Sequence, residues 1–273
     1  MYLKENDMKK RLLAIVLIVA LVFGLGGNVS AQAAQSDANM VLEDSLYVGQ
    51  SRRIIFQYGT SVVKGSKVDF EIIKGSDVVE MPDEKTIKAL SAGEALIRGT
   101  YKKYSIDYVI TVVEAPKMKA RKVKVGDVKI AVPKDFVDGE PSEGGILLKN
   151  TKNDTSLIIG AGMSYDIENT KLSQDDWDQI NNEIAAAVET TCNAVFSSYM
   201  GAGFELTDMD YTSEIVKNGT VRYQCAFKLK NIGNYYLDVV GICKEDGTVI
   251  LAIAAGYSKK TVNGSIDYIL KKN

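Results

Sequence analysis

Carboxylate pairs are the side chains of this 273-residue sequence best suited to acid–base chemistry, because the chain contains no histidine. A chain without histidine has no Ser-His or Cys-His nucleophile pair and no His-ligated zinc. Asp208 with Asp210, or Asp175 with Asp176, would supply the acid and the base of a glycosidase. That reaction needs two facing carboxyl groups about 5–10 Å apart in a cleft, which sequence neighbours seldom provide. We therefore expect Asp208 and Asp210 to flank the start of a strand, and we predict no catalytic residue.

A calcium site is the second chemistry to consider. Asp166 and Glu168 lie in a Ser-Tyr-Asp-Ile-Glu segment that leads to an expected helix, and calcium prefers oxygen ligands of this kind. The segment lacks the loop spacing of a known calcium motif. The sequence therefore predicts neither a metal site nor a cofactor.

Aromatic residues are a third group that could bind a ligand, because their rings can stack on sugars. The chain has 14 tyrosines. Those that could stack in this way include Tyr101, Tyr104, Tyr235 and Tyr236. We favour packing within a sheet, with each hydroxyl at the solvated end. The single tryptophan, Trp177, is likewise expected to pack, on the apolar stripe of a helix.

Composition and charge favour two folded domains and exclude a basic nucleic-acid-binding protein. Lys and Arg total 33 and Asp and Glu total 35, so the formal net charge is −2. This balance leaves no basic excess to cover a phosphate backbone, and we expect no nucleic acid partner. A content of 46% hydrophobic residues and only 4 prolines suits a folded chain, and its length suits two cored domains.

Residues 1–33 have the pattern of a secretory signal peptide. A positive group at 9–11 precedes an apolar run at 12–23, and Ala31 and Ala33 supply the small residues of a cleavage site. An uncleaved membrane anchor is the alternative, although the run is shorter than the ~20 residues that span a bilayer. We expect cleavage near Ala33 and a secreted, extracellular protein that is free or held on the cell wall. Membrane contact would then come only through an uncleaved signal peptide.

Residues 34–116 are expected to form a β-sandwich, because short alternating runs are separated by turn signals. The runs predict seven strands at 51–57, 62–63, 68–72, 78–81, 86–89, 94–101 and 104–112. In the last run Ile106, Tyr108 and Ile110 share one face, whereas Asp107 is on the other. Pro116 follows, and proline cannot donate to a ladder.

This segment resembles the bacterial immunoglobulin-like domain, group 2. The resemblance rests on LYVGQS at 46–51, VDF at 68–70, VVE at 78–80, IKALSAGEA at 87–95 and VITVV at 109–113. The run at 87–95 is the most specific part. The family usually has tryptophan where Phe70 stands, and the segment has no cysteine for an inter-sheet disulfide. The resemblance implies an all-β immunoglobulin-like sandwich that serves as a spacer or adhesive module of the cell surface.

A short basic linker is expected at residues 117–122. A charge run this brief favours a solvated connector between two domains. Contact with a polyanion such as wall teichoic acid is the alternative.

Residues 123–273 combine strand and helix patterns, as in an α+β domain. A hairpin is expected at 123–132, strands at 145–149, 156–161, 220–230, 235–244 and 248–256, and a final helix at 261–271. A long helix is expected to begin at Ser173, where Asp176 completes a cap, and to end at Gly201 and Gly203. Its apolar stripe consists of Trp177, Ile180, Ile184, Val188, Cys192, Val195 and Tyr199.

This order of elements, with VPKDF at 132–136 and GILL at 145–148, resembles the PsbP-like fold, which also occurs in DcrB-type bacterial envelope proteins. The resemblance covers about residues 121–273. It implies an antiparallel sheet with helices on its faces and a non-catalytic binding or assembly role. No ligand residue carries over, because the chain has no histidine and no metal motif of the family matches it.

Three cysteines are an odd number for a secreted chain, in which disulfides are common. A three-residue turn at 231–233 would set Cys225 opposite Val239 and leave Cys243 four residues further along its strand. At ~3.4 Å per residue this separation is too large for a disulfide. We predict three buried, reduced thiols. A bridge from Cys192 to one of the strands is the alternative.

Two functions from different classes remain. The favoured one is a secreted bacterial, non-enzymatic cell-surface binding or scaffold protein, whose immunoglobulin-like module displays a PsbP-like domain to a cell-surface protein or glycan. The alternative is a carboxylate-dependent cell-wall or glycan hydrolase. A cleft with two facing carboxylates would favour the hydrolase, whereas a closed sheet with covered faces would favour the binding protein.

Overall fold

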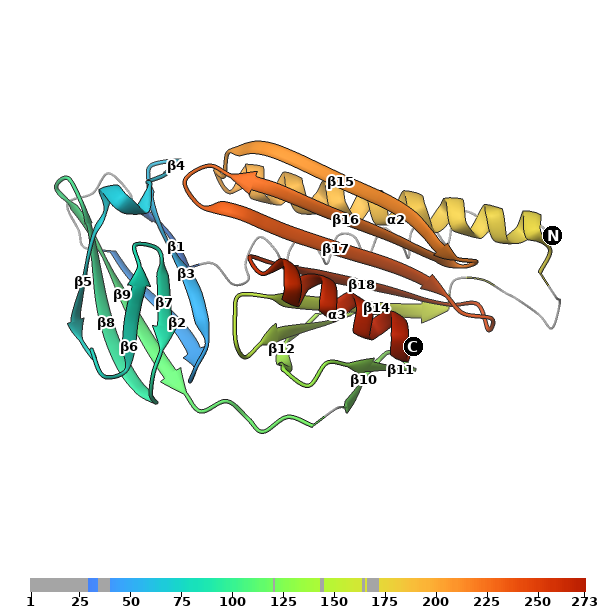
Figure 1. Ribbon diagram of the computed structural model, residues 1–273, viewed down its shortest axis with the longest axis horizontal. Helices are drawn as coiled ribbons and strands as arrows, with labels where there is room; N and C mark the ends of the chain where they lie inside the picture. Colours follow the sequence, from blue (N-terminus) through green and yellow to red (C-terminus); the bar gives the residue numbers. More distant parts are fainter. Residues whose placement is uncertain (1–28, 34–39, 120, 143–144, 164, 166–171) are drawn as a thin grey trace.

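The computed structural model describes residues 29–33, 40–119, 121–142, 145–163, 165 and 172–273, and it is mostly β with two α-helices (Figure 1). Residues 1–28 of the expected leader at 1–33 lie outside these residues, as do Asp166 and Glu168, the two side chains considered for calcium. None of the described helices is long and apolar enough to cross a membrane.

The first domain has two sheets around one core. Its strands are β1 (Val29–Ala33), β2 (Met40–Tyr47), β3 (Ser51–Tyr58), β4 (Ser61–Val62), β5 (Asp69–Lys74), β6 (Val79–Asp83), β7 (Thr86–Ala89), β8 (Gly93–Tyr101) and β9 (Tyr104–Val113). One sheet has the order β1-β3-β7-β6 with β4 beside β3, and the other has the order β2-β9-β8-β5. Alternate residues of β3 and β9, including Ile54, Phe56, Tyr108 and Ile110, meet in the shared core.

All seven strands expected here are present, with ends shifted by one or two residues, and two more occur. Both additional strands pair in parallel: β1 with β3, and β2 with β9. A parallel partner is distant in sequence, so no hairpin signal marks it. Ala31 and Ala33, the expected cleavage residues, lie in β1 opposite Phe56 and Tyr58. Cleavage after Ala33 would therefore remove this strand from its sheet.

The second domain is built on a seven-stranded antiparallel sheet with the order β12-β13-β14-β18-β17-β16-β15. Its strands are β12 (Phe136–Ser142), β13 (Gly145–Asn150), β14 (Ser156–Met163), β15 (Leu206–Lys217), β16 (Thr220–Leu229), β17 (Gly233–Cys243) and β18 (Thr248–Gly256). A separate hairpin joins β10 (Arg121–Val125) to β11 (Val128–Val132). The helices are α2 (Gln174–Gly201) and α3 (Lys259–Lys272).

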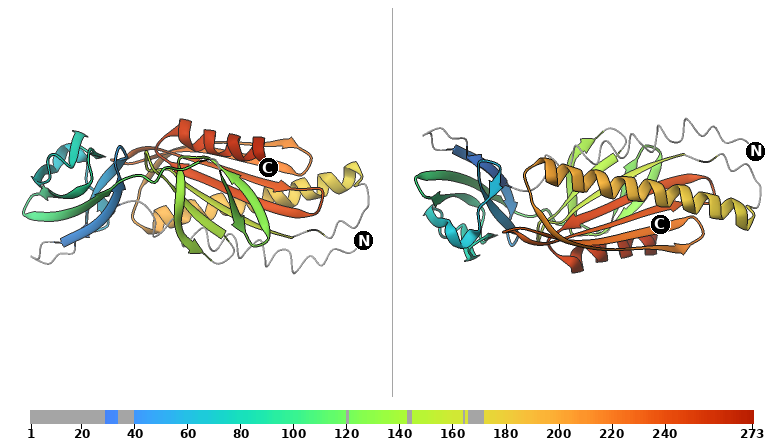
Figure 2. Two further views of the ribbon diagram at one scale, coloured as in Figure 1. Left: turned by 90° about the horizontal axis from the view of Figure 1, so that it is seen from below. Right: turned by 90° about the horizontal axis from the view of Figure 1, so that it is seen from above.

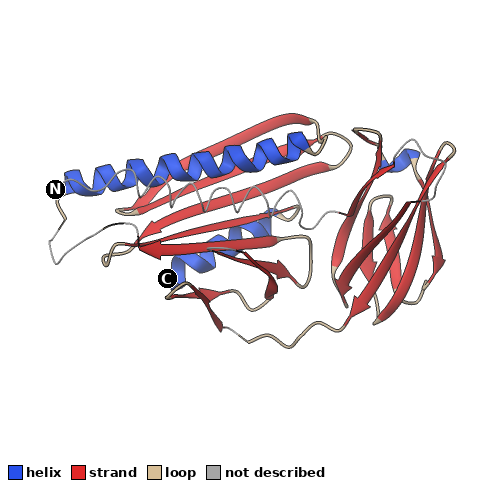
Figure 3. Ribbon diagram, turned by 180° about the vertical axis from the view of Figure 1, so that it is seen from behind, coloured by secondary structure: helices blue, strands red, loops and turns tan. Residues whose placement is uncertain are grey.

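Both faces of this sheet are covered (Figures 1 and 2). Helix α2 lies along one face, where Ile184, Val188 and Cys192 pack on β16 and β17. Helix α3 and the β10–β11 hairpin cover the other face, with Val262 and Ile266 in a second core. Figure 3 shows α2 running along the sheet from the far end towards the first domain. The domain therefore has two apolar layers, one on each side of the sheet.

Local sequence signals account for the start of α2. The Ser173 side chain accepts from the Asp176 backbone N–H, and the Asp176 side chain accepts from the Ser173 N–H. Hydrogen bonds from the Ser173 hydroxyl and from its backbone N–H to the Asp176 carboxylate lower the pKa of Asp176. The expected capping box is therefore confirmed, and the apolar stripe faces the sheet as expected.

Three expectations for the second domain need correction. Strand β12 was not expected, because it contains Gly139 and Pro141, which signal a turn. Of β15 only a strand start near Asp208 and Asp210 was expected, because all of its residues but the first are exposed. The linker is shorter than 117–122, because β10 begins at Arg121. The β16–β17 turn is shifted by one residue, so that Cys225 lies opposite Leu237 rather than Val239. Asn231 has φ of 64° within this turn, which fixes its geometry.

Candidate functional site

The carboxylates that could act as acid and base do not face one another in a cleft. Asp208 and Asp210 lie inside β15, rather than at its start, and point to the same exposed side of this edge strand. Asp175 is exposed beside Asp176, which caps α2. Neither pair has the geometry of a glycosidase. The described residues also contain no group of three or more His, Cys, Asp or Glu side chains that could hold a metal ion.

Of the four aromatic candidates Tyr235 is buried, and Tyr101, Tyr104 and Tyr236 are half-buried. Tyr101 and Tyr104 contact the ring of Tyr58, with centroids 5.9 and 4.8 Å away. Tyr235 is buried between Tyr199 and neighbouring rings of the α2 core. Tyr236 is half-buried on the α3 side of the sheet, and Trp177 packs on the α2 core.

A buried polar cluster, which we call the domain junction, joins the two domains. Arg52 of β3 forms ion pairs with Asp44 of β2 and with Asp154, which lies between β13 and β14. The Arg52 Nε atom is 3.2 Å from Asp154 Oδ1, and the Arg53 backbone N–H donates to Asp154 Oδ2 at 2.7 Å. Burial raises the pKa of Asp154 to about 7, although Arg52 opposes the shift. Both oxygens of Asp154 are thus held by donors from the first domain.

Further hydrogen bonds and apolar contacts extend the domain junction. The bonds run from Gln50 Nε2 to Asn150 O (2.9 Å), Ser51 N to Lys152 O (3.0 Å), Arg53 Nη1 to Ile232 O (2.7 Å), Gln57 Nε2 to Ala202 O (3.2 Å) and Asn231 Nδ2 to Val62 O (2.8 Å). Ile55 of β3 is buried in the α2 core of the second domain, together with Phe204 and Ile232. The sequence did not mark any of these residues as contacts between domains.

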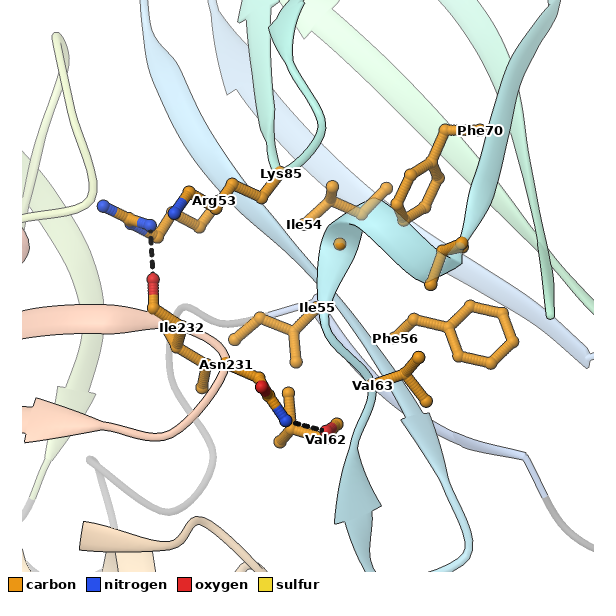
Figure 4. A pocket seen from close by; sticks show the side chains of 12 residues that line it. Arg53, Ile54, Ile55, Phe56, Val62, Val63, Phe70, Lys85, Asn231 and Ile232 are labelled. Carbon is orange, nitrogen blue, oxygen red and sulfur yellow. Dashed lines mark hydrogen bonds between the residues drawn. The ribbon is translucent and has the colours of Figure 1, made fainter. Parts of the chain in front are cut away.

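A small cavity lies beside the domain junction (Figure 4). Arg53 and Asn231 border it and bond across the gap, and Ile54, Val63 and Phe70 line its inner side. Its volume of about 10 Å³ is room for about one water molecule. The domain junction is therefore a filled joint rather than a ligand pocket.

An open hollow of about 780 Å³ lies at the other end of the second domain. Trp177 forms part of its wall, together with Lys217, Lys244 and Asp246. Asp246 Oδ1 accepts from the Thr248 N–H, and backbone hydrogen bonding lowers the pKa of Asp246. The charged side chains of the hollow are mixed in sign, which gives it no selectivity for an anion or a cation.

The outer edge of the sheet is the most unusual surface of the second domain. Among the described strands, β15 pairs with β16 alone and ends the sheet. Met209, Tyr211 and Ile215, which we call the apolar edge row, lie opposite Phe227, Cys225 and Val221, so they point to the α2 side. Their exposed fractions are 43, 57 and 60%, since α2 packs on β16 and β17 and leaves them open. The sequence does contain a signal for this row, because apolar residues alternate with polar ones along the strand.

The opposite side of β15 carries negative charge. Asp208, Asp210 and Glu214, which we call the acidic edge row, lie opposite Lys228, Ala226 and Arg222. Arg222 is engaged elsewhere, by Asp238 and by Asp267 of α3. Within the described part of the chain, none of the three acidic side chains forms an ion pair. Strand β15 thus presents an open backbone edge, an apolar side and an acidic side.

Comparisons with known proteins show only distant likeness. No family model matches the chain, and no curated protein matches it. A solution structure of cyanobacterial PsbP from Synechocystis sp. PCC 6803 is similar with 14% identity and a TM-score of 0.33, over 59% of this chain and 93% of that one. An endo-fucoidan hydrolase of glycoside hydrolase family 107 is similar with 9% identity and a TM-score of 0.20, over 79% of this chain. This chain covers 30% of that hydrolase.

Proposed function

We propose that this protein is a secreted, non-enzymatic binding or scaffold protein of the bacterial cell surface, and that β15 is the surface that contacts its partner. The exposed apolar edge row on the strand that ends the described sheet carries this proposal. Soluble domains usually protect a long edge strand by charge, proline or a cover, because an open edge can pair with another chain. On β15 charge protects the side of the acidic edge row, whereas the side of the apolar edge row is exposed. An edge of 12 residues with large apolar side chains in solvent is typical of an interaction surface.

The rest of the second domain supports a role in binding rather than catalysis. Over its central strands both faces of the sheet are covered, by α2 on one side and by α3 with the β10–β11 hairpin on the other. Asp154, a carboxyl group whose pKa is strongly raised, is buried in the domain junction. A fixed joint of this kind suits a scaffold, because the first domain then holds the β15 edge in a defined orientation.

The test compares binding of the purified protein and two variants to intact bacterial cells, isolated cell wall and a glycan panel. Tyr211→Thr with Ile215→Thr removes two members of the apolar edge row. Threonine is used because it is β-branched and favours a strand. Val41→Thr is the matched control, because Val41 is 56% exposed on β2, the edge strand of the other domain. We expect the double variant to lose about ten-fold in affinity, as for truncated central contacts of an interface, and the control to bind normally.

Two results would contradict the proposal. One is unchanged binding of the double variant to every surface. The other is turnover of peptidoglycan or a polysaccharide by the pure protein that a single Asp or Glu substitution abolishes, since that result would establish the hydrolase.

A further inference from the structure

We infer that the partner bound at β15 is an extended, basic segment of another protein, which adds to the sheet as an eighth strand with lysine or arginine alternating with apolar residues. This inference rests on the proposed function and specifies the chemistry of the partner. The geometry of β15 sets three independent requirements for a partner. The partner must pair with the open backbone edge, place apolar side chains beside the apolar edge row and place basic side chains beside the acidic edge row, and an extended basic segment meets all three.

The backbone requirement comes from the position of β15. The ladder of β15 with β16 is regular from Asp208 to Ile215, with register shifts only beyond those two residues. Eight residues at ~3.4 Å per residue give an open edge of about 27 Å. An extended peptide can satisfy the outward N–H and C=O groups of such an edge, and main-chain hydrogen bonds then supply affinity.

The side-chain requirement comes from the two rows. In a strand, successive side chains point to opposite sides, so an added strand presents alternate residues to each row. Apolar residues of the partner would extend the apolar edge row, where Tyr211 already stacks on Tyr223 with centroids 5.4 Å apart. Residues of the opposite set would lie beside Asp208, Asp210 and Glu214 and must be basic to be favourable.

A second copy of this chain fits the edge less well. Two β15 strands related by a two-fold axis perpendicular to the sheet would place both acidic edge rows on the same side. Six carboxylates would then lie together, and in the register that pairs Met209 with Ile215 each Asp210 would oppose Glu214. Like charges directly opposite one another destabilise a strand pair. The charge of the edge therefore favours a basic partner over self-association.

The experiment measures binding of a fluorescein-labelled nonapeptide, in which lysine alternates with valine, to the purified protein by anisotropy. Two control peptides separate the contributions: one has glutamate for lysine, and one keeps all side chains but has every backbone amide N-methylated. We expect each control peptide to bind at least about ten-fold more weakly, because it lacks either the charge complementarity or the main-chain donors. Binding should also weaken as salt concentration rises.

Variants of the protein locate the site. Asp210→Lys should weaken binding of the lysine peptide about five-fold, since it replaces an attractive cross-strand pair with a repulsive one. Glu43→Lys on β2 is the matched control, because Glu43 is an exposed acidic residue on another edge strand, and it should bind within about two-fold of the original protein. Thermal unfolding of both variants checks that each is folded.

Three outcomes would overturn the inference: equal binding of the N-methylated peptide, equal effects of Asp210→Lys and Glu43→Lys, or a concentration-dependent dimer that Tyr211→Thr dissociates. The outcome also separates this inference from the proposed function. If the peptide fails to bind but the Tyr211→Thr, Ile215→Thr variant still loses cell-surface binding, only the basic-strand partner is wrong. If that double variant binds cells normally, the proposed function is wrong.

Discussion

The Nε atom of Arg52 lies 3.2 Å from Oδ1 of Asp154, although the two residues belong to different domains and are 102 positions apart. Arg52 also binds Asp44, so one guanidinium serves two carboxylates. The connector after β9 is therefore not the only link between the domains, and the domain junction fixes their relative orientation.

The domain junction should weaken as pH rises. In the folded protein burial raises the pKa of Asp154 to about 7, from an ordinary value of 3.8. The folded state therefore holds a proton that the unfolded chain has already lost. The resulting stabilisation is complete below about pH 3.8 and is lost as pH rises through 7, with a slope of at most about 1.4 kcal/mol per pH unit.

Urea unfolding at pH 5, 6.5 and 8 measures this dependence. We expect the free energy of unfolding to fall across the series, and Asp154→Asn, which cannot titrate, to remove most of the fall. After trypsin has cut at Lys117 or Lys119, the two halves should coelute at pH 5 on size exclusion. A flat pH profile, or a profile that the Asn variant retains, would contradict the predicted titration of Asp154.

Arg222 should be important for stability because its partner is buried. Asp238 has no exposed surface, and Arg222 donates to both of its oxygens, at 3.0 and 2.6 Å. Burial raises the pKa of Asp238, and the bonds from Arg222 oppose the shift. Arg222→Met would leave this carboxylate without its cation, and we expect a loss of about 3–5 kcal/mol in the free energy of unfolding.

The matched control for that change is Arg98→Met in the first domain. Arg98 also donates to both oxygens of a cross-strand aspartate, Asp107, but its side chain is 38% exposed. A solvated pair contributes only about 0–1 kcal/mol. In denaturant unfolding, the loss in the free energy of unfolding should therefore be several-fold larger for Arg222→Met than for Arg98→Met. Equal losses would show that burial of Asp238 does not set the importance of its partner.

Two glycine-to-alanine changes should have opposite effects on the free energy of unfolding. A Cβ atom at Gly241 would lie 2.3 Å from Ile184 Cγ2 of α2, whereas one at Gly264 would have no neighbour within 4 Å. Gly241→Ala should destabilise the protein by about 1–3 kcal/mol, because the helix must move from the sheet. Gly264→Ala in α3 should stabilise it by about 0.5–1 kcal/mol through helix propensity. Thermal unfolding tests both; a stable Gly241→Ala variant would mean that α2 packs less closely.

The three cysteine thiols should not react with a thiol reagent in the native protein. Cys192, Cys225 and Cys243 are buried and unbridged. Burial raises the pKa of Cys225 and Cys243 to about 12, so thiolate is scarce at pH 8. Ellman's reagent at that pH should react with no thiol before denaturation and with about three afterwards. One reactive group after denaturation without reductant would instead reveal the alternative bridge from Cys192.

Local patterns were sufficient for most elements. Helix α2 was predictable because its cap, Ser173 with Asp176, and its apolar stripe lie within one continuous segment. The strands of the hairpin at 121–132 were predictable for the same reason, since a short turn joins them. The residues of β15 also alternate, but strand prediction relies on a buried face, and Met209, Tyr211 and Ile215 have none.

The sequence by itself determined the type and order of most elements, because hydrophobic periodicity, helix caps and hairpin turns depend on neighbours within a few residues. Only the tertiary structure decided which surfaces are closed and which stay open. Ile55 alternates with the core residues Ile54 and Phe56, which would place it in solvent, yet the second domain covers it. By its sequence Asp154 is an ordinary turn residue, and only the fold places Arg52 beside it. Both depend on contacts between residues about 100 or more positions apart, which no local pattern contains.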